Sequence, residues 1–202
     1  ITMGVRPSDQ EWKRELNREP LERDPLGEME RLYRLINTEF EQNEEAASLA
    51  RQELVKLQNG DAENLAIWKE MIALSLREFE KIYQRLGVKF DFILGESYYN
   101  SALKGVVQRL RDIGLARESE GAAVVFFDDV PELKGTPALI QKSDGGANYT
   151  TTDLATIEYR LETWQPAEIV YVTDARQQLH FRQLFEIFRR WMPEAPVKLS
   201  HV

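Results

Sequence analysis

Residues 138–164, ALIQKSDGGANYTTTDLATIEYRLETW, contain a complete strand-to-helix junction. The apolar run over 138–141 predicts a strand. Gly145 and Gly146 follow in a polar turn, and apolar residues at helical spacing over 150–164 predict a helix. A strand that ends in a glycine turn and enters a helix is typical of an α/β protein.

The same alternation continues on both sides of this junction. Strands that alternate with helices of this length predict a parallel α/β sheet. We therefore expect residues 88–202 to form one domain of that kind. The predicted strands cover 88–94, 122–127, 138–141, 168–173 and 197–202, and the predicted helices cover 103–113, 150–164 and 177–192.

The first part of the chain has a different pattern. Apolar residues recur every three or four positions in three stretches between 26 and 87, which predicts three helices joined by short turns. Gly60 suits the end of one helix, and Asp61 suits the N-cap of the next. Residues 1–25 are highly charged and contain three prolines, so we interpret them as an arm or linker.

Composition excludes several classes of function. The 202 residues include 26 Lys and Arg against 34 Asp and Glu, a net charge of −8, without the basic excess of a typical nucleic-acid binder. The absence of cysteine excludes disulfides and thiolate metal sites, and two histidines argue against a His-rich zinc site. No apolar run is long enough to cross a bilayer. We expect a cytoplasmic protein with no metal site and no membrane partner.

The first candidate site follows the strand at 138–141. Ligands of open α/β sheets bind beyond the carboxyl ends of the strands. Asp153 could hold a guanidinium or an ammonium group there, and Tyr149, four residues earlier, offers a ring and a hydroxyl. The alternative is structural, because Thr and Asp at a helix start commonly cap the helix and favour its dipole.

The second candidate site follows the strand at 168–173. Gln177 could orient a ligand with one donor and one acceptor group, and His180 could donate to phosphate oxygens near a helix start. The alternative is that His180 is an ordinary helix-surface histidine. Polar groups at two strand-to-helix junctions, expected at the same end of one sheet, favour the functional interpretation.

Further chemistry is sparse. Ser97 or Asn100, in the segment after the strand at 88–94, is interpreted as a cap of the following helix rather than a ligand contact. The sequence shows no Ser-His-Asp set, no paired catalytic carboxylates and no metal-ligand spacing, so no residue is assigned as catalytic. The turn at 143–148 matches neither a Walker loop nor GxGxxG, which argues against another nucleotide-binding α/β enzyme.

Taken together, these segments resemble the class I arginyl-tRNA synthetases over residues 24–202. The resemblance rests on LGVKFDFILGESYYN (86–100), SDGGANYTTTDLATIEYR (143–160) and VTDARQQLHF (172–181). It implies a partial Rossmann-like parallel sheet. Residues 26–87 would be a helical insertion, and residues 88–202 the second part of an incomplete catalytic domain.

The resemblance also implies roles for four residues. Tyr149, Asp153 and Gln177 would contact arginine, and His180 would lie against ATP. The full-length family members activate arginine with ATP, with Mg²⁺ as the expected companion ion and no prosthetic group, and transfer it to tRNA(Arg). The chemistry would depend on positioning and charge stabilisation rather than on a covalent intermediate.

The sequence departs from the family in two places. It contains neither the HIGH-type nor the KMSKS-type sequence of class I synthetases. We therefore expect this fragment to carry the arginine-binding half of a ligase and to be inactive alone. The alternative is a stand-alone arginine-binding or regulatory module derived from the synthetase fold. An incomplete sheet would expose an edge or an apolar face, so we also expect self-association.

Overall fold

The computed structural model describes residues 18–58 and 60–202, so most of the expected arm lies outside the described residues. The chain divides into two compact units between Asp91 and Phe92, shortly after Gly87, where the sequence pattern changes. Each unit has its own helices, and both sheets lie in the second. Within the described part of the chain, no helix is both long and apolar enough to span a membrane.

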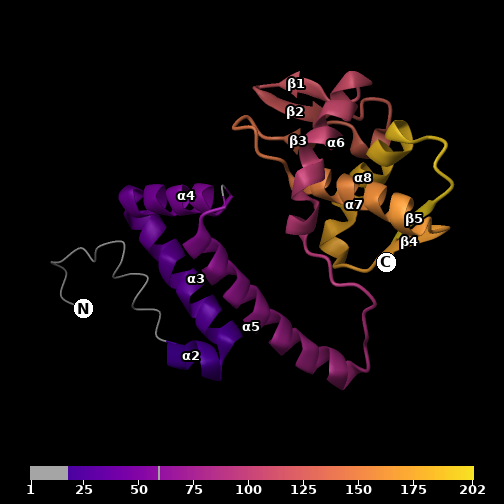
Figure 1. Ribbon diagram of the computed structural model, residues 1–202. Helices are drawn as coiled ribbons and strands as arrows, with labels where there is room; N and C mark the ends of the chain where they lie inside the picture. The colour runs from indigo at the N-terminus through magenta and orange to yellow at the C-terminus, as the bar shows by residue number, and fades with distance from the viewer. Residues whose placement is uncertain (1–17, 59) are drawn as a thin grey trace. The chain divides into compact units, whose positions relative to one another are not determined.

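The first unit is helical, in indigo to magenta in Figure 1. Asp61 accepts a hydrogen bond from the Asn64 amide at 3.0 Å, which confirms it as an N-cap. The first described helix lies within the expected arm or linker, and it tolerates Pro20 because a proline in the first turn removes no helical hydrogen bond. The helices are α2 (Arg18–Arg23), α3 (Pro25–Gln42), α4 (Glu44–Gln58) and α5 (Ala62–Leu86).

The second unit mixes helices with short strands. The expected mixed α/β class is confirmed, and all three predicted helices form within a few residues of their predicted bounds. The elements are η1 (Glu96–Tyr99), α6 (Asn100–Asp112), β1 (Arg117–Ser119), β2 (Ala122–Val125), η2 (Pro131–Leu133), β3 (Ala138–Gln141), α7 (Tyr149–Trp164), β4 (Glu168–Tyr171), η3 (Ala175–Gln177), α8 (Gln178–Trp191) and β5 (Lys198–His201).

The strands form two sheets rather than one parallel sheet. β4 and β5 are parallel, as predicted, with Glu168 opposite Lys198. β1, β2 and β3 form an antiparallel sheet, so the prediction that β2 and β3 are parallel is wrong. Parallel neighbours need a long crossover, usually a helix. The segment 126–137 contains only the 3₁₀ turn η2, with two prolines and a glycine, so the chain turns back antiparallel.

The predicted strand at 88–94 is also wrong. This segment has no regular secondary structure, and Phe90, Phe92 and Ile93 are exposed. A strand needs a neighbour to satisfy its backbone donors and acceptors. No residue in the described ranges pairs with this segment, so its alternating pattern does not become a strand.

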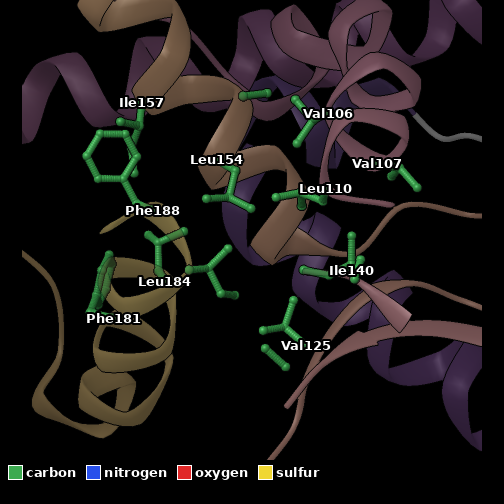
Figure 2. Close-up of a cluster of buried hydrophobic side chains, with 14 of the residues drawn as sticks. Val106, Val107, Leu110, Val125, Ile140, Leu154, Ile157, Phe181, Leu184 and Phe188 are labelled. Atoms are coloured by element: carbon green, nitrogen blue, oxygen red, sulfur yellow. The ribbon is translucent and has the colours of Figure 1, made fainter. Parts of the chain in front are cut away.

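The core of the second unit is centred on α7, which packs against α6, β3 and α8. Figure 2 shows the side chains that meet there. Leu154 and Ile157 of α7 are fully buried, and so is Leu184 of α8. Burial of these side chains fixes how α7 and α8 are rotated, and therefore where their first turns point. The labelled core residues are Val106, Val107, Leu110, Val125, Ile140, Leu154, Ile157, Phe181, Leu184 and Phe188.

Candidate functional site

The start of α7 is tied to the end of β3. The Asn148 amide nitrogen donates to the Ile140 carbonyl at 3.2 Å, and its side-chain Nδ2 donates to Leu139 O at 3.1 Å. The buried Thr151 hydroxyl donates to the same Ile140 carbonyl at 2.7 Å. Asn148 and Thr151 therefore anchor the helix to the strand, and the first turn of α7 has a fixed position.

The start of α8 is held in a similar way. Asp174 accepts a hydrogen bond from the Arg176 amide at 2.9 Å and caps η3, which leads into α8. One turn after His180, the side-chain Nε2 of the buried Gln183 donates to the Thr136 carbonyl at 2.7 Å. Phe181 is buried beside His180. The imidazole of His180 therefore projects from a backbone that is fixed on both sides.

Asp153 and His180 meet between the two helices. His180 Nε2 and Asp153 Oδ2 are 2.6 Å apart, a short charge-assisted contact. The His180 side chain is 13% exposed and that of Asp153 is 31% exposed, so the carboxylate still reaches solvent. Asp153 is the fifth residue of α7, beyond the capping positions. Its carboxylate binds His180 instead of capping the helix.

Tyr149 completes a group of three side chains. Its ring lies 4.8 Å from the His180 ring at an interplanar angle of 72°, an edge-to-face arrangement. Tyr149 is 56% exposed. Because Tyr149 and Asp153 are one helical turn apart, an aromatic ring and a carboxylate border the same solvent-accessible surface. Such a surface can take a flat cation on its carboxylate and ring.

Gln177 lies near this group but is not part of its contacts. It is the last residue of η3 and its side chain is exposed. The Gln177 amide nitrogen donates to the Asp174 carbonyl at 2.9 Å, which closes the 3₁₀ turn. The structure thus brings three of the four predicted site residues into contact and leaves Gln177 three residues before His180.

The reason for this convergence differs from the sequence prediction. The two junctions were expected at the same end of one sheet, but β3 and β4 belong to different sheets. The packing of α7 against α8 brings them together instead. Helix packing depends on side chains distant in sequence, which the spacing of the two motifs does not show.

Tyr171 is a buried residue beside the site that the sequence analysis missed. It ends β4, and its ring packs 4.7 Å from the Phe181 ring. Burial raises the pKa of the Tyr171 hydroxyl, the Asp153 charge adds to the effect, and the Arg160 guanidinium, 5.4 Å from the ring, opposes it. The alternation of EIVY already places Tyr171 on the buried face with Ile169, which is a usable signal.

The segment Glu96–Tyr99 has a structural role in this arrangement. The prediction that Ser97 or Asn100 caps the following helix is wrong, because neither η1 nor α6 has a side-chain cap bond. Instead, Tyr98 Oη donates to Tyr159 Oη at 3.2 Å, and Tyr99 is buried with its ring 5.6 Å from that of Tyr159. Aromatic packing therefore joins this segment to α7.

Comparison with known proteins identifies the family. The family model described as tRNA synthetases class I (R), catalytic domain, matches residues 10–202. The chain belongs to this family. The sequence resemblance is thereby confirmed, and with it the mixed α/β fold of a class I synthetase catalytic domain.

Individual relatives agree with the family. The arginine–tRNA ligase of Fusobacterium nucleatum is 42% identical over 172 residues, covering 85% of this chain and 30% of the relative. That of Chromobacterium violaceum is 42% identical over 183 residues, covering 88% and 32%. The crystal structure of Plasmodium falciparum arginyl-tRNA synthetase matches with a TM-score of 0.68 and 31% identity, covering 79% of this chain and 28% of that one. The chain thus spans about a third of the length of the curated relatives it matches.

Proposed function

We propose that this chain carries the arginine-binding part of an arginine–tRNA ligase. Such an enzyme joins arginine to ATP as an adenylate, with release of pyrophosphate, and then transfers the arginyl group to tRNA. Membership of the family and the ligase relatives support the proposal. Tyr149, Asp153 and Gln177 are the proposed arginine contacts.

The observation that carries this proposal is the partly exposed Asp153 carboxylate beside the Tyr149 ring. His180 occupies Oδ2, while Oδ1 accepts no hydrogen bond from any residue in the described ranges. A guanidinium presents its donors in a planar fork and stacks on aromatic faces. Arginine can therefore bind Asp153 with its guanidinium edge and lie against Tyr149 with its face.

The remaining substrates and the setting belong to the same proposal. ATP, accompanied by Mg²⁺ as part of the substrate, and tRNA(Arg) are the proposed partners of the full-length protein, and the cytoplasm is its proposed location. The family resemblance implies that His180 lies against ATP. Its contact with Asp153 motivates a different role.

Calorimetry with arginine and with lysine tests the arginine-binding proposal. We expect the chain to bind arginine with a preference over lysine. Asp153→Asn should weaken arginine binding by at least about tenfold, because hydrogen bonds to charged groups contribute about 1.5–3 kcal/mol. Glu162→Gln makes the same carboxylate-to-amide change at an exposed position of α7 and should leave affinity unchanged. Unaltered binding by the Asp153 variant would contradict the proposal.

Arginine-dependent pyrophosphate exchange separates binding from activation. We expect no exchange by the chain alone, because its sequence contains neither the HIGH-type nor the KMSKS-type motif. Arginine binding without exchange is the result expected for a substrate-binding part. Robust exchange would show that these 202 residues activate arginine without those motifs.

A further inference from the structure

We infer that His180 is a positioning residue for Asp153: it fixes the orientation of the carboxylate that receives the guanidinium and thereby sets the preference for arginine over lysine. This inference rests on the proposed function. It assigns His180 a part in amino-acid selectivity, where the sequence suggested contact with ATP.

His180 makes a direct hydrogen bond to Asp153. His180 Nε2 lies 2.6 Å from Asp153 Oδ2, so Nε2 carries a proton and donates it to the carboxylate. The two residues are 27 positions apart and lie on different helices. Since α7 is tied to β3 through Thr151 and α8 is tied to Thr136 through Gln183, the hydrogen bond joins two fixed elements. The carboxylate cannot rotate freely about its last torsion while that bond is kept.

The other ring nitrogen of His180, Nδ1, indicates which tautomer is present. His180 Nδ1 is buried and has no hydrogen-bond partner among the residues described. A proton on Nδ1 would be a buried donor without an acceptor, which is unfavourable. The geometry therefore favours the neutral imidazole with its proton on Nε2, which donates to Asp153 and nowhere else.

Two aromatic rings hold the imidazole of His180 in place. The Tyr149 ring lies 4.8 Å from it, and the Phe181 ring lies 5.0 Å from it. With 13% of the side chain exposed, the ring has little room to turn. One ring nitrogen is engaged and the other is buried, so neither is available to a phosphate oxygen. This is why the ATP role suggested by resemblance does not fit His180.

The orientation of the Asp153 carboxylate can distinguish arginine from lysine. A guanidinium binds a carboxylate in a planar, directed arrangement, whereas an ammonium is a compact charge that accepts many directions. A carboxylate held by His180 is already oriented for a guanidinium. Losing the constraint should therefore weaken arginine binding and leave lysine binding almost unchanged. A purely structural role for His180 would affect both amino acids alike.

The test compares two His180 variants in the 202-residue chain by calorimetry with arginine and lysine. His180→Leu fills much of the volume without a donor and should weaken arginine binding about tenfold, with lysine affinity changed by less than about twofold. His180→Gln places an amide donor near the position of Nε2 and should restore most of the arginine affinity. Gln178→Ala, at an exposed position on the same helix, should match the parent chain.

Nitrogen NMR of the imidazoles gives a readout that needs no ligand. The sequence has two histidines, so a His201→Gln variant assigns both sets of signals. We expect His180 as the neutral form protonated on Nε2, with that proton protected from exchange in the parent chain and unprotected in Asp153→Ala. If His180→Leu fails to fold, these signals together with His180→Gln decide the question.

The outcomes separate the two proposals. If the parent chain and the Asp153 variants show no difference in arginine binding, the proposed function fails. If Asp153→Asn loses arginine while His180→Leu keeps it, or loses both ligands equally, the positioning role is wrong and the proposed function stands. An His180 ring protonated on Nδ1 alone would also overturn the positioning role.

Discussion

Two buried polar atoms beside the candidate site lack a hydrogen-bond partner among the described residues: Tyr171 Oη and His180 Nδ1. The two rings both lie against Phe181, at 4.7 Å and 5.0 Å. A buried ring nitrogen that carries no proton and accepts no hydrogen bond reduces stability only slightly. A buried hydroxyl that donates to nothing costs about 1–3 kcal/mol of stability. Tyr171 Oη meets no partner at hydrogen-bond distance, and its interaction with the nearby Arg160 guanidinium satisfies it only weakly, so this hydroxyl reduces stability beside the site.

Tyr171→Phe should stabilise the chain by about 1 kcal/mol, because it removes the unpaired hydroxyl and keeps the ring. It should also change the alkaline response. Burial raises the pKa of Tyr171 in the folded state, so the unfolded chain loses this proton first as pH rises past about 10. The free energy of unfolding of the parent then falls with rising pH, and the variant lacks this contribution.

Urea denaturation at neutral pH and at about pH 10.5 measures both effects of Tyr171→Phe. The gain of the variant over the parent should be larger at the alkaline pH. A gain that shrinks at alkaline pH would mean that the hydroxyl is stabilised in the fold by a partner.

The residues of the candidate site were partly predictable. The four-residue spacing of Tyr149 and Asp153 is enough to place them on one helical face. Their contact with His180 was not predictable, because it arises from the packing of α7 on α8 across 27 residues of sequence. Capping, the structural alternative for the threonines, does not describe Thr151, because its hydroxyl bonds back to the strand, a contact that helix spacing does not specify.

Among the elements, helices followed their sequence pattern, whereas strand pairing followed the prediction only for β4 and β5. Helical spacing is local, and α5, α7 and α8 form close to where it predicts. The strand β1 was missed altogether. It pairs with β2 across a two-residue turn, Glu120-Gly121, whose φ angles are 52° and 78°. Such turns usually begin with Asn or Asp, because other side chains are strained at positive φ. With Glu120 at the first turn position, the sequence gives no hairpin signal here.

The hairpin turn gives a paired prediction. Glu120→Asn should stabilise the second unit by about 0.5–1 kcal/mol, because asparagine tolerates a positive φ at the first turn position. Gly121→Ala should destabilise it by about 1 kcal/mol or more, because φ there is 78° and a Cβ strains that conformation. Chemical denaturation of both variants checks the pair. Equal effects of the same sign would argue against this turn geometry.

For the molecule as a whole, the two-stranded sheet is the least covered part of the second unit. Burial alternates along β4, so that Ile169 and Tyr171 face the core while Val170 is 50% exposed. Val172, just past the strand, is 78% exposed. Within the described ranges, β4 pairs with β5 alone, which leaves unpaired backbone groups along its other side. An open edge beside exposed valines favours pairing with another chain.

We therefore expect the chain to self-associate, with sedimentation equilibrium showing a dimer that dissociates on dilution. Val172→Lys should shift the equilibrium towards monomer, because a lysine at a strand edge must lose hydration or repel its counterpart when two copies meet. Thr163→Lys adds the same charge at an exposed position of α7, outside the strands, and should leave the equilibrium unchanged. Equal weakening by the two variants would indicate general charge repulsion, and a monomer at high concentration would show that the open sheet stays solvated. The distinction matters for the site as well, because β4 ends in Tyr171, whose hydroxyl senses the Asp153 charge. A partner on this sheet would therefore lie near the proposed arginine-binding surface.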